Sequence, residues 1–105
     1  MPQRLRIDRG FTIGAGAVQC WTWNWHGEPD ADRGPVLFVA DPKDVPPPQR
    51  VVLVTYDIAK CRAGPNEPHP SEVFYEFKIR NDSNITVAFR LEIVLLDDLP
   101  VRDTA

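Results

Sequence analysis

The chain alternates apolar and polar residues with a period of two in several segments. Trp21, Trp23 and Trp25 follow this period, with Thr22 and Asn24 between them. Successive side chains of a β-strand project to opposite faces, so the three indoles share one face of a predicted strand. A helix with the same spacing would give no coherent stripe. The row carries roughly 600 Å² of mostly apolar surface, which a soluble monomer rarely exposes in one patch.

Residues 73–79 and 85–95 show the clearest alternation. Apolar residues take every second position of each segment, and residues such as Phe74, Glu76 and Lys78 fill the positions between. The connection at residues 81–84 is short and polar. This pattern predicts a β-hairpin with one face toward the core and one toward water. The expected inner row consists of Tyr75, Phe77, Ile79, Val87, Phe89 and Leu91.

The other apolar segments are also of strand length. We expect an edge strand at residues 5–7, and a short strand at 11–13 after a turn at Arg9 and Gly10. Residues 36–40 and 51–58 form two further predicted strands, and residues 57–63 allow one helical turn instead of a strand end. Six to seven strands without a clear helix predict an antiparallel β-sandwich, either immunoglobulin-like or jelly-roll-like. A small β-barrel is the alternative.

The length predicts one domain. The chain has 105 residues, and we expect residues 1–105 to form a single β-sandwich domain with a polar tail from about residue 97. The N-terminal residues contain no apolar segment of the kind found in secretory signals, and no stretch is long enough for a membrane span. These features predict a cytoplasmic protein.

Residues 75–89 carry a resemblance to a known class of domain. An aromatic-rich strand there ends in Arg80 and Asn81, and small polar residues follow. This segment resembles the closing hairpin of bacterial immunoglobulin-like sandwich modules. The resemblance covers about a seventh of the chain and implies a fold class without implying functional residues. The chain lacks the Cys-Trp-Cys arrangement of true immunoglobulin domains, because Cys61 precedes the expected hairpin.

The charge narrows the range of partners. The formal net charge is −3 and the isoelectric point is about 5.2. Nucleic acid and anionic membranes attract basic surfaces, so neither is an expected partner. A protein partner, self-association or a glycan remains.

The residue types that carry catalysis do not form a recognisable set. Cys20 and Cys61 lie too far apart in sequence for a metal motif, and both are expected to be reduced. His26 and His69 lie in or beside loops with no local nucleophile. Two N-glycosylation patterns begin at Asn81 and Asn84, in a polar turn that favours such residues anyway. We therefore predict no enzyme activity, no catalytic residue and no cofactor.

Three acidic residues alternate in the loop that follows the tryptophans. Glu28, Asp30 and Asp32 could offer oxygens to calcium, but their spacing does not match the calcium loop of helix-loop-helix proteins. We expect a solvated acidic loop and no metal.

The tryptophan row supports two interpretations. Buried indoles would fill the space between two sheets, and this interpretation is favoured because buried aromatics are more common than exposed ones. Exposed indoles would form a platform for sugar rings or for a protein. We therefore predict a non-enzymatic protein-interaction or assembly module, with a carbohydrate-binding module as the alternative. The expected binding residues are Trp25, His26, Glu28, Asp30, Asp32 and Arg33, joined by Trp21 and Trp23 if the row is exposed.

Overall fold

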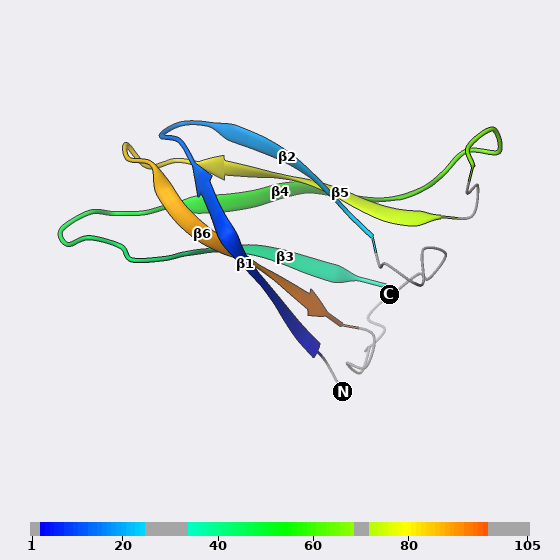
Figure 1. Cartoon of the computed structure of the whole chain (residues 1–105), viewed down its shortest axis with the longest axis horizontal. Helices are drawn as coiled ribbons and strands as arrows, with labels where there is room; N and C mark the ends of the chain where they lie inside the picture. The colour runs from blue at the N-terminus through cyan, green and yellow to red at the C-terminus, as the bar shows by residue number, and fades with distance from the viewer. Residues whose placement is uncertain (1–2, 25–33, 69–71, 97–105) are drawn as a thin grey trace, which may run out of the picture.

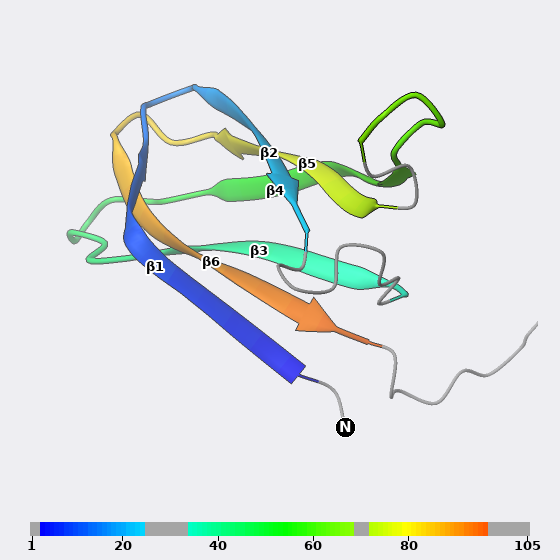
Figure 2. The same cartoon turned by 45° about the vertical axis from the view of Figure 1, so that its right-hand side comes forward.

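The chain folds into two layers of antiparallel strands (Figures 1 and 2). The computed structural model describes residues 3–24, 34–68 and 72–96. One sheet has the strand order β1-β6-β3, and the other has the order β2-β5-β4. The predicted β-sandwich is therefore confirmed, and the alternative of a closed barrel is wrong for the described strands. The six strands are β1 (Gln3–Ile13), β2 (Val18–Trp23), β3 (Val36–Pro42), β4 (Leu53–Arg62), β5 (Val73–Asn81) and β6 (Val87–Leu95).

The predicted hairpin between β5 and β6 is wrong. β5 is the central strand of one sheet and β6 is the central strand of the other, so residues 82–86 cross between the layers. Each central strand is hydrogen-bonded on both edges by other strands, which leaves neither free to pair with its neighbour in sequence. Their apolar faces meet across the interior instead. The likeness of residues 75–89 to an immunoglobulin-like closing hairpin is therefore not reproduced.

The predicted inner row is buried as expected, because alternation fixes which face of a strand is apolar. Each of its six residues is at most 3% exposed. The sheets thus form one continuous core, to which β1 and β3 also contribute. The row is Tyr75, Phe77, Ile79, Val87, Phe89 and Leu91.

Strands β1 and β4 are each longer than predicted, and each contains an irregularity. β1 is a single strand from residue 3 to residue 13, and the expected turn at Gly10 is an irregularity within it, where Gly10 has a φ of 71°. β4 continues to Arg62 past an irregularity at Asp57, whose φ is 54°. Pairing of Ala59 with Glu76 holds this part of β4 in the sheet, so the helical turn considered for residues 57–63 is wrong.

Trp21 and Trp23 point into the sandwich. In the β2–β5 register they lie opposite Phe77 and Tyr75, which are core residues. Both indoles are half-buried and pack against the core. The Trp21 ring stacks on Phe77 at a centroid distance of 6.0 Å, and it meets Phe11 edge-on at 4.9 Å. These two members of the row thus act as core residues, as the favoured interpretation expected.

A buried asparagine ties one end of the sandwich together. Asn81 is fully buried, and its side-chain Nδ2 donates hydrogen bonds to the carbonyls of Ile13 (3.1 Å), Gly14 (3.1 Å) and Ile85 (2.8 Å). Its Oδ1 accepts from the backbone N–H of Ser83 at 2.8 Å. The side chain therefore links the β1–β2 turn to the crossover between the sheets. The amide nitrogen of Asn81 is fully hydrogen-bonded in the folded protein. Of the two N-glycosylation patterns, only the one that begins at Asn84 therefore has an exposed asparagine.

An ion-pair cluster covers the outer face of the β1-β6-β3 sheet. Glu92 of β6 accepts hydrogen bonds from Arg4 at 2.8 Å and from Arg6 at 3.1 Å. Its side chain is only 11% exposed although it faces outward. The hydrogen bond from Arg4 lowers the pKa of Glu92, burial acts in the opposite direction, and the hydrogen bond from Arg6 lowers the pKa further.

This cluster predicts a specific dependence of stability on pH. The folded-state pKa of Glu92 lies below its ordinary value of 4.5, so its stabilising contribution is complete above that pH. The contribution disappears as the pH falls through the folded-state pKa. Glu92→Gln is therefore expected to lower the urea midpoint at pH 7, and its difference from wild type is expected to shrink as the pH falls below 4.5. Glu76→Gln, an exposed change on the other sheet, serves as the control, and an equal effect of the two variants would contradict the prediction.

Candidate functional site

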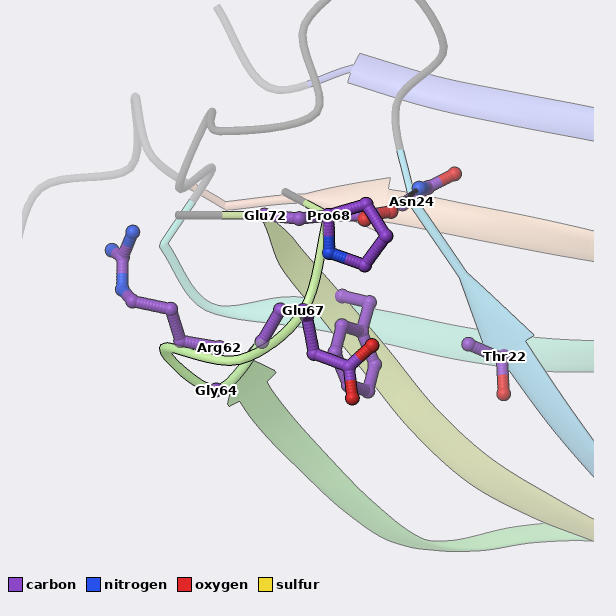
Figure 3. Close-up of a pocket in the computed structure, with 9 residues that line it drawn as sticks. Thr22, Asn24, Arg62, Gly64, Glu67, Pro68 and Glu72 are labelled. Atoms are coloured by element: carbon purple, nitrogen blue, oxygen red, sulfur yellow. Dashed lines mark hydrogen bonds between the residues drawn. The ribbon is translucent and has the colours of Figure 1, made fainter. Parts of the chain in front are cut away.

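A groove of about 590 Å³ lies on the outer face of the β2-β5-β4 sheet (Figure 3). It is placed where β2 ends, β5 begins and residues 63–68 leave β4. We call it the outer groove. Its lining residues are Thr22, Asn24, Arg62, Ala63, Gly64, Glu67, Pro68, Glu72 and Phe74.

The alternation of the strands explains why these side chains face outward. Because Trp23 points into the core, its neighbours Thr22 and Asn24 fall on the opposite face. Tyr75 of β5 is likewise buried, which places Phe74 outside. Phe74 is half-buried there and supplies an aromatic surface within the groove.

The loop after β4 forms one wall of the groove. The backbone N–H of Ala63 donates to the carbonyl of Glu72 at 2.9 Å, which closes the base of the loop. A second bond, from the N–H of Glu67 to the carbonyl of Gly64 at 3.0 Å, forms a turn. These two bonds shape the loop of residues 64–68, which carries Glu67.

Two of the polar side chains that line the groove are carboxylates, those of Glu67 and Glu72. Asn24 donates a hydrogen bond from Nδ2 to Oε1 of Glu72, which links the end of β2 to the start of β5. Glu67 forms no side-chain hydrogen bond or ion pair with another described residue. Figure 3 shows its carboxylate on the side of the loop that faces Thr22, whereas the Arg62 guanidinium extends away from it. The groove thus combines an aromatic ring with two carboxylates.

This arrangement suits binding. A Thr hydroxyl, an amide and two carboxylates can accept hydrogen bonds, and Phe74 can pack against an apolar group. The cysteines lie on the same outer face, where Cys20 pairs across strands with Lys78 and Cys61 pairs with Phe74. Both cysteines are free, and the central strand β5 separates the strands that carry them.

The site expected from the sequence shares no described residue with this groove, and the two only adjoin at the end of β2. Asn24 is the last described residue before the expected binding segment, and it lines the groove. Trp21 and Trp23 face the core on the other side of β2. The remaining expected residues lie outside the described part of the chain, namely Trp25, His26, Glu28, Asp30, Asp32 and Arg33.

Sequence reasoning identified none of the nine lining residues of the groove. Glu67, Glu72 and Phe74 were not among the expected binding residues, although Phe74 offered a signal. It occupies a position on the polar face of an otherwise strictly alternating strand, where a large aromatic side chain is unusual. No local pattern indicated that Glu67 would lie beside it.

Three further findings concern metal binding, membrane-spanning helices and similarity to known proteins. Across residues 3–24, 34–68 and 72–96, no group of three or more histidine, cysteine or acidic side chains is arranged to hold a metal ion. None of these residues belongs to a helix that could cross a membrane. Comparisons with protein-family models, with curated proteins and with solved structures found no match to this chain.

Proposed function

We propose that this chain is a non-enzymatic protein-interaction module and that the outer groove is its binding site. The observation that carries the proposal is Phe74, an outward-facing aromatic residue on a central strand, surrounded by polar groups. Protein interfaces commonly place an aromatic anchor inside a polar rim. The groove's volume of about 590 Å³ is sufficient for one or two side chains of a partner.

The bonds around the groove support this proposal because they hold its shape without a ligand. The contact from Asn24 to Glu72 and the bond from Ala63 to Glu72 fix both walls against β5. A preformed site loses less conformational entropy when a partner binds. The carbohydrate alternative relies on a row of exposed indoles, and Trp21 and Trp23 instead pack against the core. The groove therefore favours a protein partner.

Selection of peptides on the purified protein tests the proposal. Random 12-residue peptides displayed on phage are selected on the wild-type chain, and the enriched peptides are then measured on two variants. Phe74→Ala is expected to weaken their binding at least about ten-fold, as loss of an aromatic anchor does. Leu37→Ala is the matched control, because Leu37 is an exposed apolar residue (49%) on the outer face of the other sheet. Peptides that bind Phe74→Ala as well as wild type would contradict the proposal.

A further inference from the structure

We infer that the outer groove takes an arginine side chain from an extended segment of the partner protein. In this arrangement the guanidinium lies between Glu67 and Glu72, and the aliphatic stem packs on Phe74. The inference rests on the proposed function and adds the chemistry of the partner. The inference is based on the two carboxylates of the groove, on the hydrogen-bond acceptors around them and on the ring of Phe74.

The groove brings together two carboxylates, those of Glu67 and Glu72. Most of the other described carboxylates, with Asp44 and Glu76 as exceptions, lie beside cations of the chain itself. Glu92 pairs with Arg4, and Asp41 pairs with Arg90 at 2.9 Å. Asp8 pairs with Lys43 and Asp82 pairs with Arg80 in the same way. These pairs neutralise the carboxylates within the fold, and a partner gains little from adding another cation there.

Within the described part of the chain, no cation neutralises the two carboxylates of the groove in this way. No ion pair joins Glu67 or Glu72 to a described residue, and the one side-chain partner of Glu72 is the neutral amide of Asn24. Among the lining residues that the structure describes, Arg62 is the only cation, and Figure 3 shows its guanidinium extending away from Glu67. The groove therefore presents negative charge that a partner's cation complements.

The acceptors and the ring favour arginine over lysine. A guanidinium is planar and has five N–H donors in a fixed fork, which fits two carboxylates more fully than a single ammonium does. The Thr22 hydroxyl and the Asn24 carbonyl offer further acceptors on the β2 side. Arginine also stacks on aromatic rings more often than lysine, and Phe74 provides such a ring. A partially enclosed site strengthens these charge-assisted bonds relative to a flat surface.

The test is an NMR titration of the full ¹⁵N-labelled chain with three small probes. N-acetyl-arginine methylamide carries the guanidinium, and the citrulline analogue has nearly the same shape without the charge. The lysine analogue carries charge without the fork. The arginine probe is expected to shift the amides of Thr22, Asn24, Gly64 and Phe74 with half-saturation on the order of 1–10 mM. The citrulline and lysine probes are expected to bind at least about five-fold more weakly.

Two variants establish that the carboxylates carry the effect. Glu67→Gln is expected to weaken arginine binding at least about five-fold, because it removes a charge without changing the size of the side chain. Glu76→Gln is the matched control, since Glu76 faces outward from the same strand as Phe74 but does not line the groove. Equal binding of arginine and citrulline, or an equal effect of the two variants, would overturn the inference. Shifts spread over all acidic regions would overturn it as well.

The two experiments distinguish a failure of the inference about arginine from a failure of the proposed function. If the selected peptides depend on Phe74 but contain no arginine, and the arginine probe does not titrate, the interaction site stands and the inference about arginine fails. If no selected peptide depends on Phe74, the proposed function fails whatever the probe does. Peptides that depend on both Phe74 and an arginine support both.

Discussion

Replacing Asn81 with alanine is expected to destabilise the protein by about 4 kcal/mol, which is a large part of the stability of a typical domain. The change leaves the carbonyls of Ile13, Gly14 and Ile85 and the N–H of Ser83 without their side-chain partner. A buried polar group that loses its partner costs roughly 1–3 kcal/mol, and water entering the site recovers part of that cost. Urea unfolding followed by tryptophan fluorescence measures the loss.

Two further variants make this result specific. Asn84→Ala removes an exposed asparagine from the same crossover and is expected to change the unfolding free energy by no more than about 0.5 kcal/mol. Asn81→Asp keeps an acceptor for the N–H of Ser83 but replaces the amide donor. It is expected to be at least as destabilising at pH 7 as Asn81→Ala, because a carboxylate then faces carbonyl oxygens. A loss below about 1 kcal/mol for Asn81→Ala would show that the network does not hold the sheets together.

Phe89→Ala is expected to cost about 3–5 kcal/mol, as truncations of buried phenylalanine do. Phe89 lies on β6 with no exposed surface, at the centre of the interior between the sheets. Its ring lies 5.7 Å from that of Phe11 and 6.2 Å from that of Trp21, so its removal leaves a cavity that both sheets line. Urea titration at pH 7 gives the free energy of unfolding.

Phe74→Ala is the matched control because it is the same truncation on the other face of a central strand. Phe74 is half-buried in the outer groove, and its loss is expected to cost only about 1 kcal/mol. This small cost also makes Phe74→Ala suitable for the binding experiments. If Phe89→Ala cost less than Phe74→Ala, the inward and outward faces of the central strands would be assigned the wrong way round.

The alternation in the sequence was sufficient to predict the faces of the strands. A β-strand places every second side chain on the same side, whatever it pairs with. Phe77 and Phe89 could therefore be assigned to the core, and Trp21 and Trp23 to one shared face, without knowledge of the fold. The same rule placed Phe74 on the outer face, where it now lines the groove.

Alternation does not say which strands are neighbours. Two strands that each have one apolar face bury it equally well side by side in one sheet or face to face across two sheets. For β5 and β6 the choice was made by the strands on either side of them, since β2 and β4 occupy both edges of β5 while β1 and β3 occupy both edges of β6. This pairing between distant segments is why the predicted hairpin was wrong.

The groove and the buried asparagine also depend on distant pairing. Asn24 and Glu72 are 48 residues apart, and they meet only because β2 and β5 are aligned in a particular register. Asn81 appears in the sequence as an ordinary residue of a polar turn, and it is buried because the β1–β2 turn lies against it. Local chemistry thus determined the strands and their apolar faces. The tertiary structure decided the sheet neighbours, because hydrogen bonds between strands are satisfied by any strand edge and only the packing of the whole chain selects one.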